Sequence, residues 1–540
     1  MCGIVGTTFQ SNDQVGEIAR HDSGRMTKII RFRGPDHQAT WTPTVQQGYD
    51  QPHPICMGAS VLDISGQKIE QPWVNNNGAL CFNGEIYDRP PGSGDTRWLA
   101  EQFRGNDYNF LRDIDWHGAI AYYDYESKHV TLVRDHFGAK PLYYMIDRRW
   151  GNLKFSSSMA AFPQKSISGN NVEEYEACGG FWFHNNTPYK GVFKMNPGEV
   201  LVWDCEKNCE VKRDNLWNGF KLERNEDWSI EEFKELCINS IEKVGRHPLE
   251  KVLMLSGGLD SSVIASVLRG DPKVTAVSST FESDKVRSNI TNQFPDDSKY
   301  MKRYDNQGHM ASLTAALYEL PIEYAKVKED DLSTWSHIFM ASHHYFFGDK
   351  HRQGTRTISF KKARDLDVKI VLTGDGADEL FTGYNGDDVF IEKSKTWTKE
   401  WCQSRKRLQE NMPVSCFGDD SALNRSFWKL LTFGEANCLM SDACAGMFGM
   451  EFRAPFLTQS LAKYCLNIPI EDRLVNRDPD KIKNGTYKRL LRDGFKEELP
   501  KHILETPTKT GWASPYDSRN DDINVKEKEN YIDFLEYLAR

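Results

Sequence analysis

The sequence has no apolar run that approaches the ~18 residues needed to cross a bilayer. Its start, Met1 to Gly6, lacks the basic segment and the following apolar stretch of a secretory signal. It also has no long block of lysine and arginine, and its formal net charge is -9. Because a surface that binds nucleic acid usually carries a basic patch, these absences argue against nucleic acid and membranes as partners. We expect a cytoplasmic protein.

A paired cysteine framework is absent as well. The 12 cysteines are scattered along the chain, and the closest pair, Cys205 and Cys209, has neither zinc-knuckle nor redox-motif spacing. We therefore expect reduced cysteines that mostly serve packing. Cys2 is the exception, because it directly follows the initiator methionine.

The features that are present indicate a folded protein of enzyme size. The chain has 540 residues, too many for one compact core, and 39% of them are hydrophobic while 27% are charged. Short aromatic and β-branched runs at 130–133, 142–146 and 200–203 predict strands of a mostly antiparallel domain. A charged, asparagine-rich stretch from about 204 to 232 is typical of a connector.

The second half has a different pattern, in which short apolar runs end in glycine turns. Residues 251–255 form such a run, and after a loop with two glycines the next segment places Val263 and Val267 on one helical face. A second run, 368–372, also ends in a glycine turn. Strand, loop and helix in this order build parallel α/β sheets, which usually bind ligands at the edge formed by such turns. Beyond residue 390 the sequence predicts mainly helices.

Cys2 has the chemistry of a nucleophile if Met1 is removed. Its α-amino group then has a pKa of roughly 8 and its thiol one of about 8.5, so the amine can take the proton as the sulfur attacks. One residue would supply both nucleophile and base. On its own, Cys2 is better read as merely a small residue after the initiator.

Three further segments, together with residues 2–6, resemble the glutaminase domain of class II glutamine amidotransferases. They are Arg33-Gly34-Pro35-Asp36, Asn83-Gly84-Glu85-Ile86-Tyr87 and Gly94-Asp95-Thr96. The resemblance implies an Ntn-hydrolase-like four-layer αββα sandwich in which Cys2 is the nucleophile and Asn83 and Gly84 form the oxyanion hole. Such donors stabilise the negative charge of a tetrahedral intermediate. The resemblance also implies that glutamine is bound by Asn83, by Glu85 through its backbone, and by Asp95.

The sequence departs from this family in one respect. The family holds the glutamine α-carboxylate with an arginine ahead of a Gln-Pro pair, but no arginine occurs from Pro35 to Asp88, and Ser60 aligns best with the family position. A bidentate guanidinium is difficult to replace in carboxylate recognition. We expect weak glutamine binding or a preference for ammonium, unless Lys68 or a distant arginine substitutes.

A second candidate site follows the apolar run at 251–255. The loop Ser256-Gly257-Gly258-Leu259-Asp260-Ser261-Ser262 offers backbone N–H groups, hydroxyls and a carboxylate at the start of a predicted helix, where phosphates bind. It lacks the lysine of a Walker loop and matches the SGGxDS signature of ATP pyrophosphatases.

Three later segments resemble asparagine synthetases: residues 373–384, 451–457 and 487–492. The resemblance implies a parallel-sheet α/β ATP-pyrophosphatase domain with a helical C-terminal part, in which Asp260 and Asp378 share Mg²⁺ and Lys509 faces the developing charge as a catalytic residue. It implies that ATP and pyrophosphate are bound by Leu255, Ser256, Gly257, Gly258, Asp260, Ser261, Ser262, Gly374, Asp375 and Lys488.

The resemblance covers nearly the whole chain and predicts a glutaminase domain at 2–205, a connector at 206–230, a synthetase domain at 231–517 and a tail of unknown role at 518–540. The leading hypothesis is a glutamine-hydrolysing asparagine synthetase that adenylates the aspartate β-carboxylate and displaces AMP with ammonia from an internal channel. Asp375 stands where the family usually has Glu, so another carboxylic acid is an alternative acceptor. A catalytically impaired regulatory relative is a further alternative. Glutamine, ATP and a carboxylate are the expected partners, and a homodimer is a candidate assembly.

Overall fold

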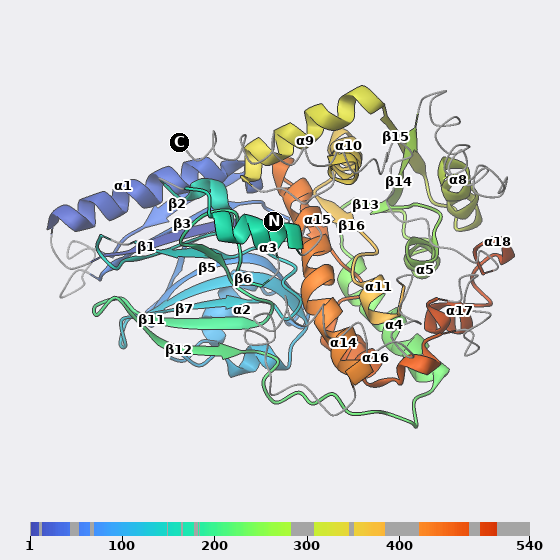
Figure 1. Cartoon of the computed structure of the whole chain (residues 1–540), viewed down its shortest axis with the longest axis horizontal. Helices are drawn as coiled ribbons and strands as arrows, with labels where there is room; N and C mark the ends of the chain where they lie inside the picture. Colours follow the sequence, from blue (N-terminus) through green and yellow to red (C-terminus); the bar gives the residue numbers. More distant parts are fainter. Residues whose placement is uncertain are drawn as a thin grey trace.

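Two antiparallel sheets form the N-terminal half of the computed structural model, and one parallel sheet forms the C-terminal half (Figure 1). Helix α15 (Glu435–Met447) runs between the two halves. None of the helices in the described ranges is long and apolar enough to span a membrane. The structure describes residues 2–9, 13–43, 53–64, 70–147, 149–163, 166–177, 182, 184–281, 307–344, 350–383, 421–474 and 487–504.

Each sheet of the N-terminal half has six strands. The first sheet has the order β10 (Val192–Lys194), β8 (Tyr143–Ile146), β9 (Leu153–Ser156), β1 (Gly3–Thr8), β3 (Ile55–Val61) and β2 (His37–Trp41). The second sheet has the order β12 (Cys209–Asn215), β11 (Glu199–Asp204), β7 (His129–Arg134), β6 (Trp116–Asp124), β5 (Gly78–Ile86) and β4 (Trp73–Val74).

The two sheets pack face to face, with a helix on each outer side. Side chains at alternate positions point to opposite faces of a strand. On β5, Cys81 lies in the apolar core between the sheets together with Ile4 of β1, whereas Leu80 packs outward with Leu99 of α2 (Asp95–Gln102). Helix α1 (Asp13–Ile29) covers the other sheet, where Ala19 packs against Cys56. The predicted four-layer αββα arrangement is therefore confirmed.

The runs at 130–133, 142–146 and 200–203 correspond to β7, β8 and β11, as the sequence predicts. Strand β12 lies inside the range expected to be the connector and pairs with β11. Its side chains are mostly exposed, so it lacks the apolar pattern that marks the other strands.

The parallel sheet of the C-terminal half has the order β15 (Ile322–Val327), β14 (Val274–Phe281), β13 (Lys251–Met254), β16 (Ile370–Leu372) and β17 (Glu451–Arg453). All four pairings are parallel. The two apolar runs that the sequence assigns to strands are β13 and β16, which are direct neighbours. The glycine turns that follow them consequently meet at one edge of the sheet, and the predicted parallel α/β fold is confirmed.

Helices surround this sheet and make up the rest of the described C-terminal part. The α-helices, beginning with α3 of the N-terminal half, are α3 (Gly169–Ala177), α4 (Ile230–Gly245), α5 (Leu259–Val267), α8 (Gln307–Leu317), α9 (Glu329–His343), α10 (Lys350–Asp365), α11 (Ala377–Leu380), α14 (Ser421–Lys429), α16 (Gln459–Asn467), α17 (Arg489–Gly494) and α18 (Lys501–Leu504). Short 3₁₀ segments of the N-terminal half are η1 (Ile30–Arg33), η3 (Asn109–Arg112) and η4 (Met159–Ala161). In the C-terminal half, η6 (Leu430–Gly434) is a π-helix and η7 (Ile470–Asp472) is a 3₁₀ helix.

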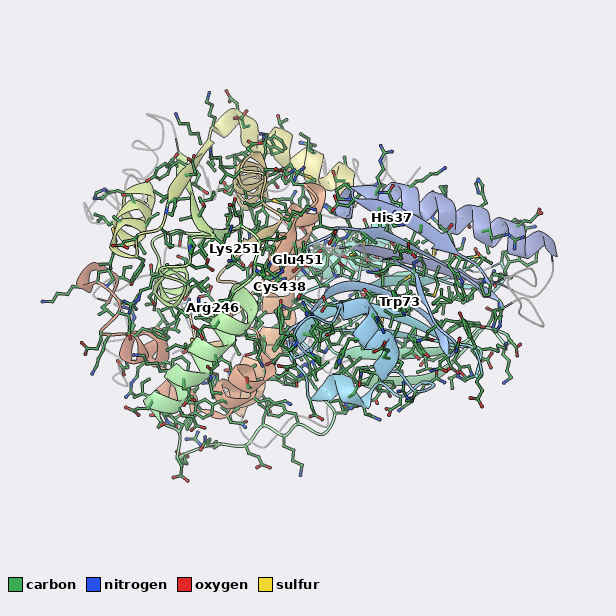
Figure 2. The ribbon with its side chains drawn as sticks, turned by 180° about the vertical axis from the view of Figure 1, so that it is seen from behind. His37, Trp73, Arg246, Lys251, Cys438 and Glu451 are labelled. Atoms are coloured by element: carbon green, nitrogen blue, oxygen red, sulfur yellow. The ribbon has the colours of Figure 1, made fainter. Side chains whose placement is uncertain are left out.

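The contact between the halves is centred on α15 and β17. Figure 2 shows Cys438 of α15 and Glu451 of β17 in the middle of the molecule, between Trp73 on one side and Lys251 on the other. Glu435 of α15 is fully buried and forms ion pairs with two side chains of the N-terminal half, at 2.6 Å from Arg134 Nη1 and 2.7 Å from Lys194 Nζ. Buried charges need such close partners, so these pairs fix how the two halves meet.

Candidate active sites

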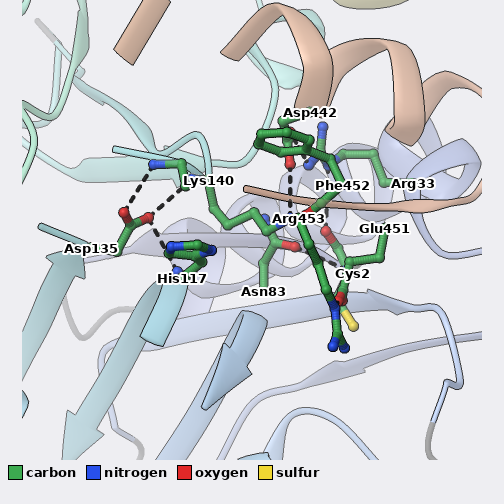
Figure 3. Close-up of polar contacts among 12 residues, drawn as sticks. Cys2, Arg33, Asn83, His117, Asp135, Lys140, Asp442, Glu451, Phe452 and Arg453 are labelled. Carbon is green, nitrogen blue, oxygen red and sulfur yellow. Dashed lines mark hydrogen bonds and ion pairs between the residues drawn. The ribbon is translucent and has the colours of Figure 1, made fainter. Parts of the chain in front are cut away.

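The first candidate site lies at the start of β1, between the two antiparallel sheets. Cys2 directly precedes β1, is only 8% exposed, and donates its backbone N–H to Asn83 Oδ1 on β5 at 2.9 Å (Figure 3). The Nε2 of Gln71 lies 3.8 Å from the Cys2 sulfur and donates to it. Burial raises the pKa of the Cys2 thiol. The thiol is therefore protonated at rest and needs a base when it attacks.

The side chain of Asn83 lies next to this cysteine, and Gly84 follows Asn83 on β5. The Nδ2 of Asn83 is buried and has no hydrogen-bond partner among the described residues. A Cβ at Gly84 would lie 2.0 Å from the backbone oxygen of His117, so only glycine permits this close approach of β5 to β6. An unpaired buried donor is costly unless a ligand completes it. Of the pair predicted to form an oxyanion hole, Asn83 thus lies beside Cys2 with an Nδ2 donor that a ligand could use.

Two residues further along β5, Glu85 belongs to a cluster of charged side chains. Its carboxylate accepts from Arg89 Nη2 at 3.3 Å and pairs with Arg453 Nη2 at 2.9 Å. Asp95, the first residue of α2, pairs with the Nε of Arg89. Arg453 also pairs with Glu451 at 2.6 Å. The predicted glutamine-binding residues Glu85 and Asp95 are therefore brought together, and each already faces a guanidinium.

Sequence reasoning assigned no role to Arg89, Glu451 or Arg453. The last two fall in the segment 451–457, which resembles asparagine synthetases as a whole. Arg89 directly follows the arginine-free stretch that ends at Asp88. Its place in the sequence, next to the segment Asn83–Tyr87, is the signal that points to it.

The position that aligns with the family arginine, Ser60, offers no room for an arginine side chain that would bind the glutamine α-carboxylate. Ser60 is fully buried on β3, and its hydroxyl donates to the backbone oxygen of Gly34 at 2.9 Å. Lys68, the other candidate from the sequence, lies outside the described residues. An arginine placed at Ser60 would have to displace a packed strand contact, so we expect it to destabilise the sheet.

The second candidate site is the loop after β13. Gly257 has a φ of 70°, and a Cβ there would lie 2.6 Å from the backbone of Met310 on α8. Within the loop, Ser256 Oγ accepts from the N–H of Gly258 at 3.2 Å and lies 3.3 Å from Ser261 Oγ. Two hydroxyls and the N-terminus of α5 therefore gather at one point, as phosphate binding requires.

The turns after β13 and β16 bring Asp260 and Asp378 to a common lysine. Lys488 Nζ lies 2.5 Å from Asp260 Oδ2 and 2.6 Å from Asp378 Oδ1. A Cβ at Gly383 would lie 2.1 Å from Asp378 Oδ1 and 2.3 Å from the Lys488 side chain, so this glycine makes the arrangement possible. Mg²⁺ is commonly held by one or two carboxylates together with substrate phosphates. The two carboxylates therefore fit a magnesium ion that binds with a nucleotide.

The other predicted nucleotide-binding residues lie around this pair where they are described. Leu255 is buried directly after β13, and its N–H donates to Val277 O at 2.8 Å. Ser262 is buried on α5, and its hydroxyl has no partner among the described residues. A Cβ at Gly374 would lie 3.1 Å from the Cβ of Asp260, so the two turns touch. Lys509 lies outside the described residues.

Asp375 is held from three directions. Its Oδ2 accepts from Thr373 Oγ1 at 2.8 Å and from Ser441 Oγ at 2.5 Å. Its Oδ1 lies 3.4 Å from Arg356 Nη2. The carboxylate at this position is therefore fixed at the edge of the sheet, with a buried guanidinium beside it.

Two successive residues of α15 contact the two candidate sites. Ser441 donates to Asp375 of the second site. Asp442 accepts from Arg33 Nη2 at 2.6 Å, and the Nε of Arg33 in turn donates to the backbone oxygen of Cys2 at 3.4 Å (Figure 3). Lys140 also lies 3.5 Å from Asp442. The helix thus links Cys2 of one half to the glycine turn after β16 of the other.

We expect Asp442→Asn to lower the free energy of unfolding by about 3–5 kcal/mol, because it leaves two buried cations facing an amide. Asp442 is 0% exposed, whereas Asp365, which pairs with Lys361 on α10, is 52% exposed. Asp365→Asn is therefore the matched control and should change the value by less than about 1 kcal/mol. Denaturant unfolding of both variants measures this difference, and equal effects would contradict a structural role for the buried pair.

Comparisons with known proteins match a different domain family to each half of the chain. Residues 1–213 match the glutamine amidotransferase domain, and residues 234–527 match asparagine synthase. The chain is 25% identical to asparagine synthetase [glutamine-hydrolyzing] 2 of Bacillus subtilis over 87% of this chain and 67% of that protein. It is 22% identical to asparagine synthetase [glutamine-hydrolyzing] of Brassica oleracea over 93% and 76%. An amidase of Gibberella zeae is 21% identical over 74% of this chain and 62% of its own length. The chain belongs to the asparagine synthase family.

Proposed function

We propose that this protein is a glutamine-dependent asparagine synthetase. The observation that carries the proposal is the presence in one chain of two chemically distinct clusters: Cys2 with Asn83, and Asp260 and Asp378 with Lys488. The first suits hydrolysis of an amide, and the second suits cleavage of a nucleotide. We assign glutamine hydrolysis to residues 2–205 and synthesis to residues 231–517.

In the proposed glutaminase, the Cys2 sulfur attacks the side-chain amide carbon of glutamine. With Met1 removed, the α-amino group of Cys2 takes the thiol proton and passes it to the departing ammonia. The Asn83 Nδ2 and the Gly84 N–H donate to the oxygen that becomes negative. Water then hydrolyses the thioester to glutamate, and the cysteine regains its proton.

In the proposed synthetase, a carboxylate oxygen of the acceptor attacks the α-phosphorus of ATP, and pyrophosphate leaves. The N–H groups and hydroxyls of the 256–262 loop hold the phosphates. Lys488 offsets the negative charge of the leaving pyrophosphate. A Mg²⁺ held by Asp260 and Asp378 would neutralise phosphate charge when bound. Ammonia then attacks the acyl carbon and displaces AMP. The product of this step is the new amide.

The acceptor is proposed to be aspartate, with another carboxylic acid as the second candidate. The observation that favours the second is Asp375, which stands in a buried hydrogen-bond network beside Arg356. A regulatory relative without turnover is a third candidate, motivated by the absence of an arginine at Ser60.

Isotope transfer tests this proposal. With ATP, Mg²⁺, ammonium and aspartate labelled with ¹⁸O in its carboxylates, we expect AMP that carries one ¹⁸O, together with pyrophosphate and asparagine. The label moves because the attacking carboxylate oxygen stays on the phosphorus when ammonia displaces AMP. Mass spectrometry of the nucleotide gives the answer. Formation of ADP and phosphate would contradict adenylation, and labelled AMP only with another acid from a panel would identify that acid as acceptor.

A further inference from the structure

The cluster around Glu85 lies where the amino-acid end of a bound glutamine would be. Asn83 and Glu85 are two residues apart on β5, so their side chains share the inner face of the sheet at about 6.8 Å spacing. If the glutamine amide is held at Cys2 and Asn83, its α-carbon, three carbon–carbon bonds away, falls near Glu85. The α-amino and α-carboxylate groups then both lie near the cluster.

A cation that binds the α-carboxylate must be accessible to glutamine. The exposed fraction of each arginine side chain near Cys2 therefore decides which of them can bind it. The side chain of Arg33 is 1% exposed and pairs with Asp442 at the contact between the halves. That of Arg453 is 2% exposed and has Glu85 and Glu451 as partners. Arg89 is 24% exposed. It is therefore the arginine of this set that a ligand can reach.

Arg89 is also held in place by the chain. Its Nη1 donates to the backbone oxygen of Ser93 at 2.8 Å, its Nη2 donates to Glu85, and its Nε pairs with Asp95. A guanidinium has five N–H donors, and three contacts leave two of them. The guanidinium therefore lies between two acidic side chains, those of Glu85 and Asp95. Because these contacts already fix the Arg89 side chain, it loses little further conformational entropy when a carboxylate binds.

We propose that Arg89 binds the α-carboxylate of glutamine and replaces the arginine that the family places at the position of Ser60. This inference rests on the proposed glutaminase function. The α-ammonium group pairs with Asp95, and the carboxylate on the same carbon faces Arg89. The loop 87–94 between β5 and α2 thus supplies the specificity that β3 supplies in the family.

Protection of Cys2 from iodoacetamide measures glutamine binding directly. Iodoacetamide lacks a carboxylate, so its rate of Cys2 alkylation should be the same in the wild-type chain and in Arg89→Ala. The glutamine concentration that gives half-protection should rise about 30- to 100-fold in Arg89→Ala. Arg89→Lys keeps the charge but loses the planar guanidinium with its paired N–H donors. The half-protection concentration should therefore rise less in this variant than in Arg89→Ala.

Arg97→Ala is the matched control, because Arg97 lies on α2 beside Asp95, is 67% exposed and pairs only with Glu101 among the contacts described. It should leave the half-protection concentration unchanged. A value for Arg89→Ala that is equal to or lower than that of the wild type would overturn the inference, and a lower value would show that Arg89 blocks the pocket. If glutamine fails to protect the wild-type chain, the proposed glutaminase function itself is wrong.

Discussion

Replacing Cys2 with alanine is expected to abolish glutamine-dependent synthesis and to leave ammonium-dependent synthesis largely intact. Only the first site needs a thiolate, and removal of a nucleophile typically costs about 10³-fold or more. The synthetase cluster around Lys488 shares no side chain with Cys2, so it should continue to use ammonium from solution. Product formation with each nitrogen source, measured on the same preparation, tests this expectation.

Cys81→Ala is the control for losing a buried thiol from the same core. Cys81 lies between the two antiparallel sheets with Cys2, and burial raises its thiol pKa above the ordinary value. We expect this variant to lose stability and to keep both activities. Equal loss with glutamine and ammonium in Cys2→Ala would contradict two separate sites. An active preparation that retains Met1 would contradict the α-amino group as the base.

The layers of the fold could be predicted because their signals are local. Short apolar runs that end in glycine turns identify β13 and β16, and short aromatic and β-branched runs identify β7 and β11, since burial of the strand faces determines residue type at each position. Strand β12 could not be predicted, because it lacks this local signal. Its exposed side chains carry no apolar alternation, and its pairing with β11 is specified by the neighbouring strand.

The charged contacts of the sites could not be predicted from local pattern. Arg33 and Asp442 are 409 residues apart in sequence, and nothing around either residue indicates the other. The same holds for Glu85 and Arg453, which come from different halves. A long-range ion pair is determined by how complete elements pack, whereas a glycine turn is determined by its own few residues. The motif residues could therefore be named, but the groups that hold them could not.

Asp378→Asn is expected to remove synthesis with either nitrogen source, by about 10²-fold or more. The carboxylate at this position lies 2.6 Å from Lys488, and both belong to the cluster proposed to face the pyrophosphate. An amide keeps the size of the side chain and loses the charge that a magnesium ion requires. Asp260→Asn should have the same effect, because its carboxylate contacts the same lysine.

Dependence on Mg²⁺ separates loss of metal binding from loss of the contact with Lys488. In Asp378→Asn, the Mg²⁺ concentration for half-maximal residual synthesis should rise, since one of two anionic ligands is missing. A variant that loses only the position of Lys488 would instead keep the wild-type Mg²⁺ dependence at a lower maximal rate. Asp365→Asn, at an exposed position on α10, should change neither quantity. Unchanged ammonium-dependent synthesis in Asp378→Asn would place the metal elsewhere and would contradict the assignment of the glycine turn after β16 to the nucleotide.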